Sequence, residues 1–197
     1  METVLIVSSV LLWVVVLLNV LLTLALVRRV NASGGLNAAG VSETGPTIGE
    51  QAPAFSAQTL EGEPATLESH TGRGRATALL FISAGCQPCH ELLATLGELL
   101  PGARQTATDL ILVSSEGRER VEALLAEFHL DMPVLLAPRD SNPFFDDYKI
   151  TGTPSYCVID EDGTVQSAGH PWPSFGAWKA LTATWTRAGK LVASGRR

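Results

Sequence analysis

The chain contains few cysteines, and their number limits the class of protein. Only three of its 197 residues are cysteine: Cys86, Cys89 and Cys157. A small and odd number excludes the fully paired disulfide framework that holds small secreted domains together. No cluster of cysteine and histidine has metal-site spacing, and no internal repeat is present. We therefore expect no metal and no other cofactor.

Charged residues are also scarce, and positive charge is scarcer than negative charge. Asp, Glu, Lys and Arg make up 17% of the chain, the net charge is −6 and the isoelectric point is about 5.2. A surface of this sign repels the phosphates of nucleic acids. We expect no nucleic-acid partner.

Charge is absent from Val4–Val27, which consists mostly of Leu and Val. About 20 apolar residues cross a bilayer as a helix, so residues 1–30 predict a transmembrane anchor. A cleaved signal peptide is the alternative, and it would have a positive N-terminal region and a shorter apolar core. Here Glu2 precedes the run, and Leu36–Ala39 matches a cleavage site only vaguely.

The residues after this run set the expected orientation and the domain organisation. Arg28 and Arg29 would place the rest of the chain in the cytoplasm by the positive-inside rule. Residues 31–48 are rich in Gly, Ala, Ser and Asn and predict a flexible linker. Residues 49–190 are expected to form one domain, with a C-terminal tail at 191–197.

The domain alternates strand and helix patterns, which predicts an α/β fold with a mixed sheet flanked by helices. Strands are expected in a hairpin at Ala54–Leu67, then at Ala76–Ser83, Asp109–Ser114, Pro133–Leu136, Ser155–Asp160 and Val165–Ala168. The first helix is expected to begin at the cysteines and close at Pro101-Gly102, and a second to end at Phe128 with Ser114 or Ser115 as N-cap. A helical turn is expected at Phe144–Tyr148, and a closing helix capped by Ser174 would bury Phe175, Trp178, Leu181 and Trp185.

Cys86 and Cys89 lie between a buried strand and an amphipathic helix. At a helix N-terminus, unpaired N–H groups and the helix dipole favour thiolate over thiol. Two cysteines separated by two residues in the first turn are close enough to form and break a disulfide. The pattern predicts a dithiol oxidoreductase in which Cys86 attacks a partner disulfide and Cys89 resolves the mixed disulfide.

Four motifs in order resemble membrane-anchored thioredoxin-fold proteins of the TlpA/ResA-like group. They are Gly49–Phe55 (G-x-x-A-P-x-F), Cys86–Cys89, Tyr148–Pro154 (Y-x-V-x-G-x-P) and Val158–Gly163, a hairpin motif. The resemblance covers about residues 47 to 188. It implies a thioredoxin fold with an N-terminal hairpin extension and an inserted strand and helix.

The anchor Ser9–Val16 is similar to that of MauD proteins, the accessory factors of methylamine utilisation. This resemblance implies a domain outside the cytoplasm, against Arg28 and Arg29. The dithiol chemistry implies protein disulfide or dithiol clients, and an anchor helix without cysteines implies a membrane redox partner. The client, reduced or isomerised during maturation, would be a methylamine dehydrogenase-type enzyme if the chain resembles MauD, or a c-type cytochrome if it resembles ResA.

Further residues are expected around the pair. Pro154 begins a strand and fits a cis peptide bond; the resemblance implies that it faces the cysteines and that the Thr153 backbone binds substrate. Four neighbours are candidate modulators: Gln87, Pro88, His90 and Glu91. His90 is equally interpretable as a solvated side chain in the first helical turn, and Glu91 as a first-turn acid that only stabilises the helix. Cys157 is interpreted as a buried, inert thiol.

Three departures from the family pattern stand out. Gly85 replaces the Trp that usually precedes the first cysteine, and Ala94 replaces a Pro that usually kinks the helix. Leu80 occupies the position where thioredoxins proper have a buried carboxylate. The first departure leaves one wall of the site either missing or supplied by another segment, and the last weakens a general-base role without removing the redox chemistry.

Three other functions remain open at this point. Cys86–His90 also reads C-x-x-C-H, the c-type haem attachment pattern, with His90 and Met132 as axial ligands. Ser83–Cys86 resembles the peroxidatic motif of peroxiredoxins, although Leu79 stands where a Pro is expected. A redox-inert module that only holds clients is the third possibility.

Overall fold

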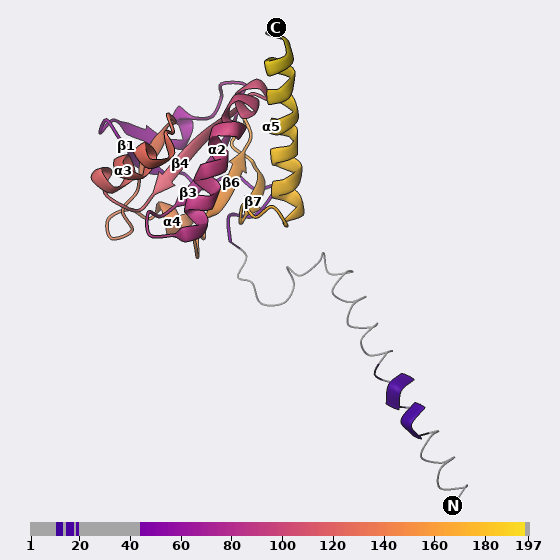
Figure 1. Cartoon of the computed structure of the whole chain (residues 1–197). Coiled ribbons are helices and arrows are strands. Elements are labelled where there is room, and N and C mark those ends of the chain that lie inside the picture. The colour runs from indigo at the N-terminus through magenta and orange to yellow at the C-terminus, as the bar shows by residue number, and fades with distance from the viewer. Residues whose placement is uncertain (1–10, 14, 18, 20–43, 196–197) are drawn as a thin grey trace, which may run out of the picture. The chain divides into compact units, whose positions relative to one another are not determined.

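The computed structural model describes residues 11–13, 15–17, 19 and 44–195 (Figure 1). The chain divides into two units, Met1–Ser42 and Glu43–Arg197, each described by itself. Within the described residues, no helix has the length and apolar character needed to cross a bilayer. Most of the predicted Val4–Val27 anchor lies outside those residues, so the anchor stays a prediction, as do the predicted domain boundaries.

The second unit is built on one seven-stranded mixed sheet with the strand order β2-β1-β5-β4-β3-β6-β7. Strands β3, β4 and β5 run parallel, and every other neighbouring pair is antiparallel. This confirms the predicted mixed sheet. The strands are β1 (Ser56–Thr59), β2 (Pro64–Thr66), β3 (Ala76–Ile82), β4 (Thr108–Ser114), β5 (Val134–Leu136), β6 (Ser155–Ile159) and β7 (Val165–Gly169).

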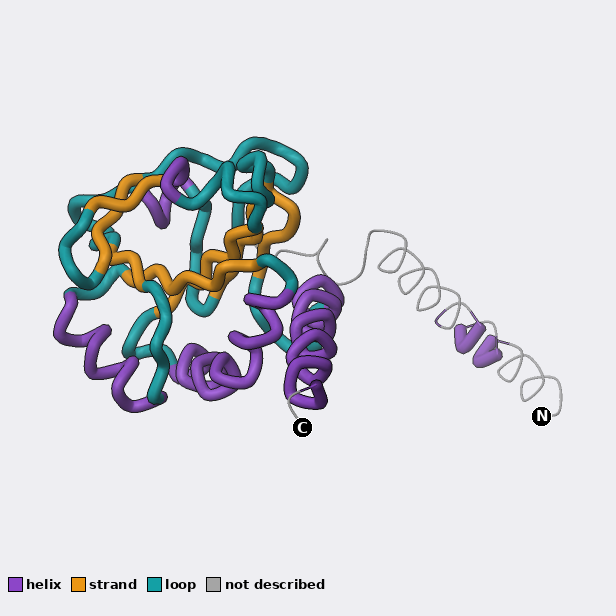
Figure 2. Tube along the Cα trace, turned by 90° about the horizontal axis from the view of Figure 1, so that it is seen from above, coloured by secondary structure: helices purple, strands orange, loops and turns teal. Residues whose placement is uncertain are grey.

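Strand β3 is apolar except for Thr77, because both faces of the sheet are covered. Leu80 and Ile82 point into one core cluster, whereas Leu79 and Phe81 point into the other, as the two-residue period of a strand requires. The three long helices lie together on one side of the sheet (Figure 2). They are α2 (Gln87–Gln105), α3 (Arg118–Phe128) and α5 (Gly176–Gly195).

The other face of the sheet carries an aromatic cluster. The short helices α4 (Phe144–Asp147) and η2 (Leu67–Ser69) cover it. The Phe55 and Phe144 rings stack with centroids 4.2 Å apart, and Tyr148 contacts both at an edge. The Tyr148 hydroxyl donates to the Pro53 carbonyl at 2.9 Å. The entry motif and the segment before Pro154 are thereby packed together.

Helix α2 is longer than the sequence predicts. It was expected to end at Pro101-Gly102, but it continues to Gln105. A proline ring inside a helix removes one hydrogen bond and crowds the carbonyl four residues earlier. Packing against α5 keeps the helix intact here. Gly102 is buried, and the backbone of α5 approaches it so closely that a side chain at this position would overlap the Trp185 carbonyl group.

Two helix starts also differ from the prediction. Ser114 lies in β4 and its hydroxyl accepts from the Glu116 N–H, so α3 begins after Gly117 instead of Ser114 or Ser115. Helix α5 begins at Gly176, and the first helical bond is accepted by the Phe175 carbonyl. Ser174 is therefore not the cap. The Phe175 side chain is 41% exposed, whereas Trp178 and Trp185 are buried as predicted.

His70 makes the stability of the domain depend on pH. Burial, followed by the positive charge of Arg73, lowers the pKa of His70 below its ordinary value, and Nε2 is buried without a hydrogen-bond partner. The unfolded chain therefore binds a proton at a higher pH than the folded chain, so stability falls as pH drops below about 6.5. In urea unfolding at pH 8 and pH 5, we expect His70→Phe to lose less stability than the unchanged chain. Equal losses would contradict this assignment.

Candidate active site

The cysteine pair sits where β3 passes into α2. After β3 ends at Ile82, a short turn leads to Cys86, which is the N-cap of α2, and Cys89 lies in the first turn. The two sulfurs form a disulfide, with Cα atoms 5.2 Å apart. Cys86 is half-buried and Cys89 is fully buried. The Cys89 N–H points at Cys86 Sγ at 3.2 Å, so the helix N-terminus faces the more accessible sulfur.

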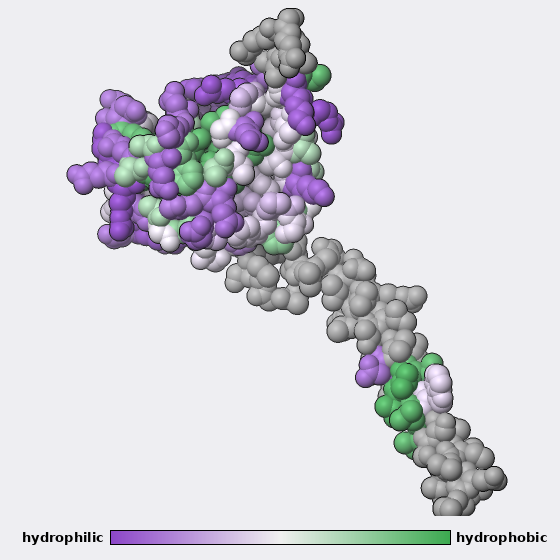
Figure 3. All heavy atoms as spheres, in the orientation of Figure 1, coloured by the Kyte–Doolittle hydropathy of each residue, from purple (hydrophilic) through white to green (hydrophobic). Residues whose placement is uncertain are grey.

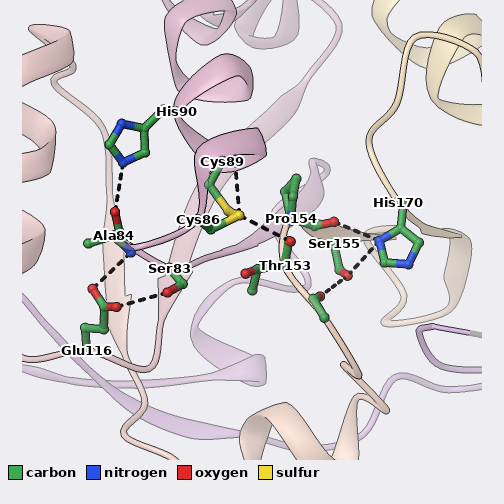
Figure 4. The surroundings of a disulfide bond; sticks show 11 residues. Ser83, Ala84, Cys86, Cys89, His90, Glu116, Thr153, Pro154, Ser155 and His170 are labelled. Atoms are coloured by element: carbon green, nitrogen blue, oxygen red, sulfur yellow. Dashed lines mark hydrogen bonds between the residues drawn. A yellow bond between two sulfur atoms is a disulfide. The ribbon is translucent and has the colours of Figure 1, made fainter.

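Thr153 and Pro154 lie beside this sulfur. Strand β6 runs antiparallel to β3 with Phe81 opposite Ser155, so the start of β6 lies next to the end of β3. The Thr153–Pro154 peptide bond is cis. The Thr153 carbonyl oxygen lies 3.2 Å from Cys86 Sγ, as Figure 4 shows. The sheet thus brings together the four predicted residues Cys86, Cys89, Thr153 and Pro154.

Glu116 holds the turn before the cysteines, and the sequence analysis missed it. Its two carboxylate oxygens accept from the Ser83 hydroxyl and the Ala84 N–H, both at 3.0 Å. Strands β3 and β4 run parallel with Ile82 opposite Ser114, so the residues that follow them share one edge of the sheet. The sequence feature that could have indicated this role is an acidic residue two positions after the end of β4.

Removing this carboxylate is expected to loosen the turn. Glu116→Ala leaves the partly buried Ala84 N–H without its acceptor, which costs about 1–3 kcal/mol. Glu116→Gln retains an acceptor oxygen, so its free energy of unfolding is expected to fall clearly less than that of Glu116→Ala. Chemical unfolding of the two variants measures the difference. A Glu116→Ala variant as stable as the unchanged chain would contradict the role of Glu116 in holding the turn.

The four predicted modulators are placed differently from one another. His90 turns away from the sulfurs: Nε2 lies 2.8 Å from the Ala84 carbonyl oxygen and the ring packs edge-on against Phe128. Gln87 and Glu91 are exposed, and Pro88 is half-buried. Because α2 begins at Gln87, Glu91 lies beyond the first turn, where the helix dipole has little effect. This corrects the interpretation of Glu91 as a first-turn acid.

The third cysteine is separate from the pair. Cys157 lies in β6 opposite Leu79 and is fully buried. Burial raises the pKa of its thiol to about 12, so the reactive thiolate is scarce at neutral pH. This placement agrees with an inert core thiol.

The haem arrangement finds no support in the described geometry. It needs both sulfurs free to form thioethers and both axial ligands directed at one iron. Here the sulfurs of Cys86 and Cys89 are bonded to each other, and His90 faces a backbone carbonyl. Met132 is buried in the core cluster beneath α2 and α3.

The surface around the domain is mostly hydrophilic on the face that Figure 3 shows, with apolar side chains gathered in smaller areas between the charged ones.

The chain belongs to the AhpC/TSA family, whose model matches residues 48–168. It is 28% identical over 169 residues to the methylamine utilization protein MauD of Methylobacillus flagellatus, covering 84% of this chain and 80% of that protein. It is 27% identical over 119 residues to the thiol-disulfide oxidoreductase ResA of Bacillus cereus, covering 60% and 66%.

Solved structures agree with this fold. The thioredoxin domain of a thiol-disulfide oxidoreductase from Bacteroides vulgatus superposes with a TM-score of 0.58 at 19% identity, covering 70% of this chain and 97% of that domain. A thiol-disulfide oxidoreductase from Bacteroides fragilis gives 0.58 at 21% identity, covering 67% and 99%. The chain therefore has a thioredoxin-like fold, and it is a thiol-disulfide oxidoreductase.

Proposed function

We propose that this chain is a membrane-tethered, extracytoplasmic oxidoreductase that reduces or isomerises disulfides of a client protein through Cys86 and Cys89. The observation that carries the proposal is the cysteine pair itself, with its accessible sulfur at a helix N-terminus beside the Thr153–Pro154 peptide. Cys86 forms the mixed disulfide, and Cys89, which is buried behind it, releases the reduced client. The Thr153 backbone and Pro154 bind the client segment beside its cysteine.

The client is a secreted redox protein during its maturation. Similarity to a methylamine utilization protein over most of the chain favours a methylamine dehydrogenase-type client. Similarity to ResA makes a c-type cytochrome the second candidate client. Each turnover as a reductase leaves the pair oxidised, so a membrane partner must return two electrons. The Val4–Val27 anchor contains no cysteine and cannot carry them itself.

Location and direction are tested together in a bacterial host that expresses the full chain. A membrane-impermeant maleimide is added to intact spheroplasts, and a second sample is quenched with acid before alkylation. We expect the impermeant reagent to label Cys86, and the acid-quenched pair to be mostly reduced. Labelling only after lysis would place the domain in the cytoplasm, as Arg28 and Arg29 indicate. A resting disulfide would instead mean an oxidase.

A further inference from the structure

His170 binds the segment that faces the cysteines, and no motif pointed to it. Strand β7 pairs with β6 as far as Gly169 opposite Tyr156. Gly169 has a φ of 145°, a backbone conformation that favours glycine, and it turns the chain at the end of the strand. The next residue then places its side chain on the backbone of β6: His170 Nδ1 lies 2.9 Å from the Pro154 carbonyl oxygen.

The partner fixes which ring nitrogen carries the proton. A carbonyl oxygen only accepts, so Nδ1 must be the donor. The same Nδ1 lies 3.4 Å from the Ser155 hydroxyl oxygen, and that hydroxyl donates to the Gly152 carbonyl at 2.6 Å. Ser155 is fully buried. His170 therefore contacts Pro154 and Ser155 directly and is linked to Gly152 through the Ser155 hydroxyl, so it holds the turn that carries the Thr153 carbonyl.

The cysteines and His170 lie on opposite sides of this turn (Figure 4). On the cysteine side, the Thr153 oxygen is 3.2 Å from Cys86 Sγ. In the disulfide this sulfur has no proton, so the approach is only a contact. When Cys86 of the dithiol carries its proton, the S–H can donate to the same oxygen. A turn held in place therefore stabilises this protonated dithiol more than the disulfide.

We infer that His170 is a positioning residue that sets the redox equilibrium of Cys86 and Cys89 by holding the Thr153 carbonyl at Cys86. The inference rests on the proposed function. The relevant reaction joins the protein disulfide and two glutathione thiols to give the protein dithiol and one glutathione disulfide. Two electrons and two protons pass to the protein pair. Anything that stabilises only the dithiol raises the equilibrium constant of this reaction.

Substitutions that remove the Nδ1–H donor and one that keeps a donor distinguish the effect of the hydrogen bond from the effect of the ring. His170→Phe keeps a ring and removes the donor, and His170→Ala removes both. His170→Asn keeps an N–H donor one bond beyond Cγ, as in Nδ1. The full chain and each variant are equilibrated with defined glutathione mixtures, quenched with acid, alkylated and analysed by mass spectrometry. Urea unfolding confirms that each variant is folded.

We expect His170→Phe and His170→Ala to shift the equilibrium about fivefold toward the disulfide, which corresponds to a reduction potential about 20 mV more negative. His170→Asn is expected to stay within about twofold of the unchanged chain. An unshifted His170→Phe, or an equal shift in His170→Asn, would overturn the positioning role and leave the proposed function intact. A pair that fails to exchange with glutathione in the unchanged chain would overturn both.

Discussion

Cys89→Ser is expected to convert the protein from a catalyst into a trap for its client. Cys86 remains at the helix N-terminus and still attacks a client disulfide, but the buried thiol that would release the client is gone. Turnover should fall by about three orders of magnitude or more, as when an essential nucleophile is removed from other enzymes. Non-reducing electrophoresis of the variant mixed with an oxidised protein such as insulin should show a covalent adduct that a reductant dissolves.

The other two cysteines supply matched controls for this trap. Cys86→Ser should form no adduct and show no turnover, because the accessible sulfur is missing. Cys157→Ala should behave as the unchanged chain, since this thiol is fully buried and its pKa is raised to about 12. Adduct formation by Cys86→Ser would reverse the assigned order of attack. Loss of turnover in Cys157→Ala with the fold intact would contradict the inert role.

Gly102→Ala is expected to destabilise the domain strongly, against the usual preference of helices for alanine. In an open helix this change stabilises by about 1 kcal/mol. Here the added Cβ would overlap the Trp185 carbonyl group, so α2 and α5 must move apart. Overpacking of this kind costs roughly 3 kcal/mol. We expect Tm to fall by roughly 10 °C in thermal unfolding followed by circular dichroism.

Gly189→Ala is the control on the facing helix. A Cβ at Gly189 would meet the Gly102 backbone at 3.5 Å and 3.6 Å, which is ordinary van der Waals contact. This variant should therefore stay within about 1 kcal/mol of the unchanged chain, on the stabilising side. If both substitutions lower the free energy of unfolding by the same amount, the close approach of the two helices at Gly102 is not what holds them together.

Sequence reasoning succeeded where a few neighbouring residues determine the structure. The turn from a buried strand into an amphipathic helix placed Cys86 and Cys89 at the helix N-terminus. A proline after Gly-Thr at a strand start was compatible with a cis bond without establishing it, and the structure contains a cis bond at Pro154. The hairpin predicted at Ala54–Leu67 is also present, and Gly62 in its turn has a φ of 90°.

It failed where strand register or helix packing decides the outcome. Glu116 reaches Ser83 only because β3 and β4 align Ile82 with Ser114, and His170 reaches Pro154 only because the β6–β7 pairing ends at Gly169. Neither alignment can be read from local patterns. Helix α2 likewise passes Pro101 because its next residue packs on α5, a contact between segments far apart in the chain.

One measurement tests the central claim most directly: electron transfer from the Cys86–Cys89 dithiol to a protein disulfide. The full chain is reduced, freed of reductant and mixed with an equimolar oxidised protein, and samples are quenched with acid, alkylated and analysed by mass spectrometry. We expect Cys86 and Cys89 to lose two alkylation sites in step with the two that the client gains, while Cys157 stays unchanged. A pair that stays fully alkylated while the client remains oxidised would contradict the claim.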